Sequence, residues 1–142
     1  MYLWDTNILT HHVNGDATLR AHLQRTTWTQ IALPSVVVAE VLRGRSDFAL
    51  KAAAAQLPLA HQLLRDTQKL LDTFQVVVFD AACASALTQL QARHRAHKRY
   101  ADLMIAAIAL AGNHTVITRN VRHFADLLPA QRIANWIDDP PR

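Results

Sequence analysis

The chain has 142 residues, 51% of them hydrophobic, which predicts one domain over residues 1–142 with a sizeable core. Its apolar stretches are far shorter than the roughly 20 residues that cross a bilayer, and Asp5 stands too early for a signal peptide. A single cysteine, Cys83, excludes an intramolecular disulfide and a cysteine-based zinc cluster. We therefore expect a cytoplasmic protein with no membrane segment.

The net charge of the chain is +4, and its 15 basic residues are three lysines and twelve arginines. The planar guanidinium group of arginine suits phosphate. This composition is compatible with a nucleic acid as partner, although a merely solvated basic surface explains it equally well.

The first third of the chain predicts short strands alternating with helices. The strands are Tyr2–Trp4 and Ile31–Leu33, and Pro34 stops the second one. The expected helices are one that Thr6 caps and that runs toward Gly15, one from Asp16 to about Trp28, and one over Val36–Arg45 that Ser35 caps.

The middle of the chain predicts a helical hairpin. Its two helices would be Phe48–Gln56 and Leu59–Phe74, broken at Pro58. Leucines give the hairpin a wide apolar face, which is more apolar surface than a small core needs.

The second half of the chain repeats the alternation of strands and helices. The expected elements are a strand over Gln75–Phe79, a helix capped by Asp80 from Ala81 to about His97, an interior helix over Ala101–Ala111 that ends at Gly112, a strand over His114–Ile117 and an edge strand within Arg132–Ile137. Strands that alternate with helices predict an α/β fold with a central parallel sheet covered on both faces.

Three acidic residues stand in apolar surroundings. Glu40, the only glutamate, lies inside the run 34–42, Asp5 ends the first strand, and Asp102 opens the interior helix. Buried carboxylates need a partner, and a hard cation such as Mg²⁺ would satisfy all three at once. Taken singly, Asp5 and Asp102 could serve as helix-terminal acids, and Glu40 could be exposed on an amphipathic helix. Asp5 and Thr118 would meet beyond the carboxyl ends of parallel strands, where ligands collect.

Four segments resemble the PIN-domain ribonucleases in order and spacing. They are Met1–Asn7, Pro34–Glu40, Ala101–Ala107 and Val116–Phe124, and together they span almost the whole chain. Within this family, the segments look most like the VapC toxins of bacterial toxin-antitoxin pairs. The resemblance implies an α/β/α sandwich, RNA cleavage that depends on Mg²⁺ or Mn²⁺, a homodimer and neutralisation by a cognate antitoxin protein.

The resemblance also implies which residues form the site. Asp5, Glu40 and Asp102 correspond to the metal-binding acids of the family, and Asn120 takes a fourth catalytic position that is often acidic. An amide adds no negative charge, so we expect one well-occupied ion. Asn7 and Thr118 would orient the acids, although capping of the adjacent helix and turn is an equally good interpretation.

Basic residues near these segments are candidates for binding RNA phosphates. They are Arg43, Arg45, Arg95, Lys98, Arg99 and Arg119, with Arg122 as a further candidate. For the cluster over 93–99, a solvated helix end remains an alternative.

The sequence thus predicts a magnesium-dependent endoribonuclease that acts as the toxin of a toxin-antitoxin module. Its main rival is a catalytically weak RNA-binding or protein-interaction module on the same fold, and Asn120 is the feature that favours it. A structure-specific DNA nuclease or metal phosphatase with the same acids is a third possibility.

Overall fold

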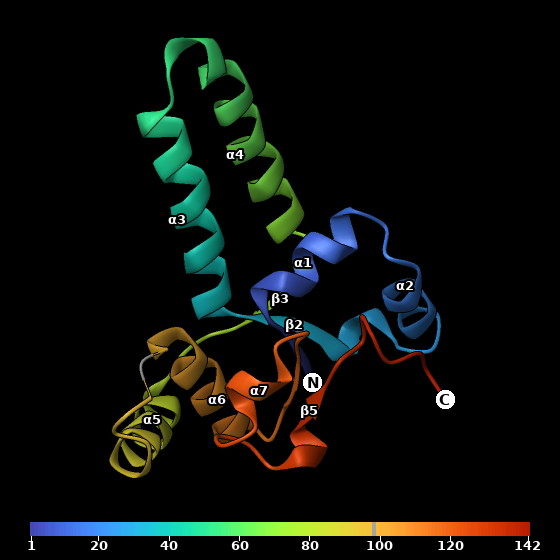
Figure 1. Cartoon of the computed structure of the whole chain (residues 1–142), viewed down its shortest axis with the longest axis vertical. Helices are drawn as coiled ribbons and strands as arrows, with labels where there is room; N and C mark the ends of the chain where they lie inside the picture. The colour runs from blue at the N-terminus through green and yellow to red at the C-terminus, as the bar shows by residue number, and fades with distance from the viewer. Residues whose placement is uncertain (98) are drawn as a thin grey trace.

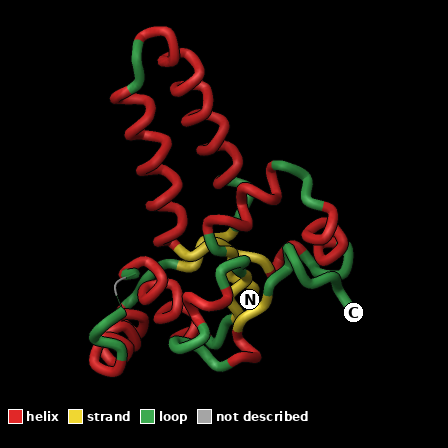
Figure 2. Tube along the Cα trace, in the orientation of Figure 1, coloured by secondary structure: helices red, strands yellow, loops and turns green. Residues whose placement is uncertain are grey.

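The computed structural model describes residues 1–97 and 99–142. A sheet lies at its centre (Figures 1 and 2). It has five strands in the order β3-β2-β1-β4-β5, and every paired strand is parallel to its neighbour. The strands are β1 (Tyr2–Trp4), β2 (Ile31–Pro34), β3 (Gln75–Val77), β4 (Thr115–Ile117) and β5 (Ile133–Ala134). The predicted α/β fold with a parallel sheet is confirmed.

Seven α-helices surround the sheet in the described part of the chain. They are α1 (Thr6–Val13), α2 (Ala17–Leu23), α3 (Ser35–Lys51), α4 (Leu57–Leu71), α5 (Ala81–Arg93), α6 (Tyr100–Gly112) and α7 (Val121–Phe124). Side chains from all five strands pack into one apolar cluster, with those of β3 and β5 only partly buried. None of the described helices is both long and apolar enough to span a membrane.

The strand order creates a crevice beside β1. The chain adds β2 and β3 on one side of β1 and β4 and β5 on the other, so the direction of winding reverses between β1 and β4. Asp5 N still donates to Ile117 O at 2.9 Å, which keeps the carboxyl ends of these two strands together. Ligands in parallel sheets bind at this kind of switch point.

Helix α6 is the interior helix that the sequence predicts. Leu103 and residues 105–109 are buried, and the helix packs closely against α5. It ends at Asn113, which adopts a left-handed φ of 58°. A Cβ atom at Gly112 would collide with the imidazole of His114, so a larger residue there would force that ring to move.

The helical hairpin exists, but its predicted boundaries were wrong. Helix α3 continues through Gly44, where the backbone is open to solvent, and runs unbroken to Lys51. The hairpin is therefore formed by α3 and α4 and protrudes from the sheet (Figure 1). The turn comes at Ala52 and Ala53, which are extended with ψ near 152° and 153°. Pro58 opens α4 instead of breaking a helix, since the first turn needs no N–H from it.

Other element ends also differ from the prediction. Asp5, not Thr6, caps α1, because its carboxylate accepts from the Thr6 N–H at 2.8 Å. Helix α2 ends at Leu23 and α5 at Arg93, where His94 leaves the helical region (φ −125°, ψ 52°). Strand β3 ends at Val77, and β5 is confined to Ile133–Ala134. The short helix α7 was not predicted.

Candidate active site

Asp5 is a buried carboxylate at the end of β1, and both of its oxygens accept hydrogen bonds. Only 7% of it is exposed. One oxygen, Oδ1, accepts from the Thr6 N–H, and the other, Oδ2, accepts from the hydroxyl of Thr118 at 2.8 Å and from the amide of Asn7 at 3.3 Å. These donors fix the direction in which the carboxylate points.

Thr118 and Asn7 link the ends of β1 and β4 around Asp5. Thr118 is completely buried, and its Oγ1 also accepts from the Asn120 N–H at 3.0 Å. The side-chain oxygen of Asn7 accepts from the Arg119 N–H at 3.2 Å. Both residues therefore make the contacts that a role in orienting Asp5 requires.

Glu40 reaches the crevice from the second turn of α3. Its Oε1 lies 3.5 Å from the hydroxyl of Thr6, which donates to it. Burial raises the pKa of Glu40 above its ordinary value, and the negative charges of Asp5 and Asp102 raise it further.

Asp102 enters the same crevice from the first turn of α6. Its Oδ2 is buried without a hydrogen-bond partner, although the Nδ1 atom of His123 lies 3.5 Å away. Burial raises the pKa of Asp102, as does the charge of Asp5, while His123, Arg99 and His97 act in the opposite direction.

The three acids therefore converge from β1, α3 and α6, close enough for their charges to act on one another. Within residues 1–97 and 99–142, no group of three or more Asp, Glu, His or Cys side chains is close enough together to hold a metal ion as it stands. Without a cation, the like charges of the three acids repel one another. The donor set nevertheless fits a hard divalent cation. The cation would give the orphaned Oδ2 of Asp102 a partner and would offset the mutual repulsion of the carboxylates.

The predicted phosphate-binding residues have different surroundings. Arg43 is exposed on α3 one turn after Glu40, Arg95 is exposed after α5, and Arg99 is exposed just before α6. Arg45 is half-buried and donates from Nε to the hydroxyl of Thr67 at 3.1 Å. Lys98 lies outside the described residues.

Two further predicted residues lie after β4. Arg119 forms a two-pronged ion pair with Asp138, at 3.1 and 3.2 Å, so it is not free to bind phosphate as it stands. Asn120 is exposed at the start of α7, and its side chain does not cap that helix. The amide is therefore accessible to solvent just after β4.

The residue-level interpretation of the sequence missed two contacts of the site. Thr6 donates to Glu40 and His123 lies against Asp102. Both residues fall inside segments that resemble the PIN family, Met1–Asn7 and Val116–Phe124. Their position in these segments was the available signal.

The sequence profile of the PIN domain matches residues 2–127 of the chain. The chain belongs to the PIN-domain family. The matched region contains Asp5, Asn7, Glu40, Asp102 and Asn120, and the resemblance predicted from the sequence is confirmed. No curated protein matches the chain.

Several solved structures are similar to this PIN domain over almost the whole chain. FitAcB from Neisseria gonorrhoeae is 25% identical, with a TM-score of 0.75 over 98% of this chain and 100% of that one. VapBC from Salmonella typhimurium bound to DNA is 22% identical, with a TM-score of 0.74 over 95% and 97% of the two chains. VapBC2 from Rickettsia felis bound to promoter DNA is 24% identical, with a TM-score of 0.70 over 95% and 98%. The two VapBC structures share the fold of this PIN domain.

Proposed function

We propose that this PIN domain is a metal-dependent endoribonuclease and the toxin of a toxin-antitoxin module. One observation carries the proposal: three carboxylates meet at the switch point of the sheet, and one buried oxygen, Oδ2 of Asp102, lacks a hydrogen-bond partner. A site with excess negative charge and an unsatisfied acceptor is suited to a divalent cation. Both the fold and the family support a nuclease.

Asp5, Glu40 and Asp102 would hold Mg²⁺ or Mn²⁺, since both ions accept oxygen ligands. When bound, the ion supplies positive charge beside the phosphate and makes a water molecule more acidic. Thr118 and Asn7 keep Asp5 in one orientation, while Asn120 contributes no charge, which favours a single ion. Hydrolysis by water leaves a 5′-phosphate and needs no serine, cysteine or histidine nucleophile.

Cleavage of a mixed pool of tRNA and rRNA tests this function. The purified protein is incubated with Mg²⁺, with Mn²⁺ and with EDTA. Discrete fragments with 5′-phosphate ends that form only with metal are expected. Cyclic phosphate ends, or cleavage that EDTA does not stop, would contradict the proposal.

The second candidate is a catalytically weak RNA-binding module on the same fold. Asn120 favours it, because the fourth position often carries an acid in the family. RNA binding without metal-dependent fragments would select this candidate.

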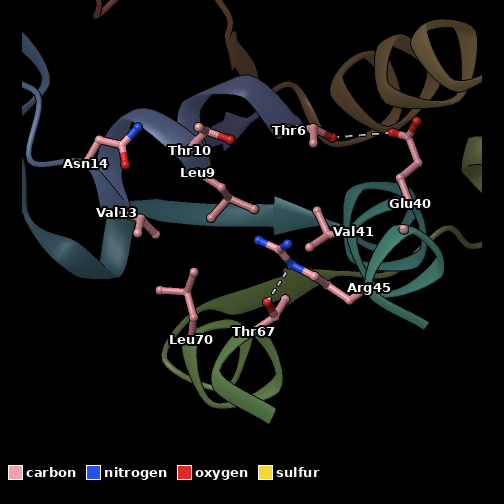
Figure 3. Close-up of a pocket in the computed structure, with 11 residues that line it drawn as sticks. Thr6, Leu9, Thr10, Val13, Asn14, Glu40, Val41, Arg45, Thr67 and Leu70 are labelled. Carbon is pink, nitrogen blue, oxygen red and sulfur yellow. Dashed lines mark hydrogen bonds between the residues drawn. The ribbon is translucent and has the colours of Figure 1, made fainter. Parts of the chain in front are cut away.

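The antitoxin would bind in the groove between α1, α3 and α4. This groove has a volume of about 480 Å³ and includes Leu9, Val13, Val41 and Leu70 (Figure 3). Glu40 lines the groove, so a chain segment bound in the groove would contact one of the three acids. A solved toxin-antitoxin complex from Klebsiella pneumoniae, 21% identical with a TM-score of 0.69 over 96% of this chain, supports a protein partner for this chain.

Replacing Val13 with aspartate should uncouple toxicity from neutralisation. Val13 is 64% exposed, so the change should spare the fold while it places a charge in an apolar groove. Expression of the wild type should arrest growth, and the protein encoded beside it should relieve the arrest. The Val13→Asp variant should stay toxic but no longer be relieved.

The control is Val78→Asp, which changes a valine that is 67% exposed and does not line the groove. Relief of the Val13→Asp variant as complete as that of the control would contradict the proposed groove. The Asp5→Ala variant should not arrest growth at all.

A homodimer is also part of the proposal. The protruding hairpin exposes Leu50 and Leu59, at 80% and 57%, and exposed leucines at a tip suit burial against a second copy. A strict monomer at high concentration in sedimentation would contradict it.

A further inference from the structure

A basic hollow lies beside the carboxylates, between the segment after α5 and helix α7. It has a volume of about 360 Å³ and is lined by Ala96, His97, Arg99, Arg122 and His123. Four of these five side chains are basic, and none is acidic. Two separate parts of the chain thus bring their positive groups to one place.

His97 holds the two walls of the hollow together. Its Nδ1 accepts from the Arg99 N–H at 3.3 Å, so that nitrogen carries a lone pair. Its Nε2 lies 3.4 Å from the carbonyl oxygen of His123, which can only accept. These two contacts tie the α5–α6 connection to α7.

The two arginines of the hollow have no counter-ion among the described residues. Arg99 and Arg122 are exposed, and neither lies within 4.0 Å of a described carboxylate. Arg119, in contrast, is paired with Asp138. The N-terminus of α6, a helix of 13 residues, begins next to Arg99 without a side-chain cap and adds the positive end of its dipole. An anion would satisfy all of these groups.

The hollow adjoins the acidic crevice. His123 lines the hollow, and its Nδ1 lies 3.5 Å from Oδ2 of Asp102. Arg99 is near enough for its charge to lower the pKa of Asp102. A group bound in the hollow would therefore lie next to the bond that the acids act on.

We propose that this hollow is a phosphate subsite, in which Arg99 and Arg122 bind a phosphate of the RNA beside the bond that is cleaved. The inference rests on the proposed ribonuclease function. The phosphate is either an internal diester or the terminal 5′-monoester, because both offer two non-bridging oxygens to the forked guanidinium group.

The first test compares the affinities of Arg99→Gln and Arg122→Gln for a short labelled single-stranded RNA, with EDTA present so that no metal-dependent cleavage occurs. Each change should weaken binding about tenfold, as expected for a charge-assisted contact. It should also make the plot of the logarithm of the binding constant against the logarithm of the salt concentration less steep, by about 0.7 for each lost phosphate contact. Arg122→Lys should restore part of the affinity. The control is Arg65→Gln, which removes the same charge from an exposed position on α4 and should leave binding unchanged.

The second test replaces one phosphate of the RNA at a time with an uncharged methylphosphonate. One replacement should weaken binding to the wild type but not to Arg122→Gln. An internal position identifies a diester, whereas sensitivity only to loss of the 5′-phosphate identifies the monoester.

The inference fails if both variants bind RNA as tightly as Arg65→Gln does, or if no replacement distinguishes the wild type from Arg122→Gln. Binding is read here without cleavage. A protein that binds through the subsite but cuts no RNA would therefore contradict the ribonuclease function and not the subsite.

Discussion

Replacing Asp102 with asparagine should lower RNA cleavage by at least about 1,000-fold, because it removes a charge that holds the cation. The same change should stabilise the protein in the absence of metal. The side chain of Asp102 is only 14% exposed, and its Oδ2 has no hydrogen-bond partner, so its charge is costly in the folded state. Activity and stability should therefore change in opposite directions.

The stabilisation should depend on pH. Burial and the charge of Asp5 raise the pKa of Asp102 in the folded protein, so the folded wild type takes up its proton before the unfolded chain does. The stability of the wild type then rises as the pH falls through this raised pKa, and it approaches that of the variant near pH 4, about the ordinary pKa of aspartate. The metal-free Asp102→Asn variant should therefore be more stable than the wild type at neutral pH, and the difference in stability should disappear in acid.

Thermal unfolding in EDTA at a series of pH values measures this difference. The control is Asp47→Asn, because the side chain of Asp47 is 55% exposed and pairs with Lys51 at 3.6 Å near the tip of the hairpin. It should change neither cleavage nor the pH dependence. Full cleavage by Asp102→Asn, or a metal-free protein less stable than the wild type, would contradict the assignment.

Replacing Thr118 with valine should both destabilise the protein and impair cleavage. Valine has nearly the same shape, but it removes the hydroxyl that donates to Asp5 and accepts from the Asn120 N–H. The carboxylate of Asp5 and the N–H of Asn120 each lose a hydrogen-bond partner, and Thr118 is completely buried, so no water replaces the hydroxyl. We expect a loss of about 2–3 kcal/mol in the free energy of unfolding, and cleavage about 10–100-fold slower because Asp5 is no longer held in place.

The matched control for this prediction is Thr118→Ser, which keeps the hydroxyl and removes only a methyl group. Urea unfolding gives the stabilities of both variants, and the rate of cleavage at saturating metal gives the activities. Serine should retain most of the activity. If valine is as stable and as active as serine, the hydrogen bonds of the hydroxyl do not hold Asp5 in place, and the prediction is contradicted.

The sequence alone predicts the sheet and two of its functional features. The apolar residues before Asp5 and Thr118 predict two strands, which end at Trp4 and Ile117, and so Asp5 and Thr118 were expected to meet beyond them. In the structure, the hydroxyl of Thr118 donates to the carboxylate of Asp5 at 2.8 Å. Asp102 could be identified because a charge that opens an almost wholly apolar helix requires a partner. In these cases local pattern and tertiary position agree.

Other features depend on contacts between distant parts of the chain. Nothing in the alanines at positions 52–55 marks a turn, since alanine favours helix, and so the hairpin was placed too late in the chain. The neighbourhood of His123 and Asp102, and the pairing of Arg119 with Asp138, join segments 21 and 19 positions apart, respectively. Periodicity and charge cannot show which side chains meet across such loops.

The most direct test of the central claim is a titration with Mn²⁺, with the free ion followed by its electron paramagnetic resonance signal. If Asp5, Glu40 and Asp102 hold one cation, the wild type and Asp47→Asn should bind one ion with the same affinity, and Asp102→Asn should bind it at least about 100-fold more weakly. Equal affinity of Asp102→Asn and the wild type for Mn²⁺ would contradict the claim.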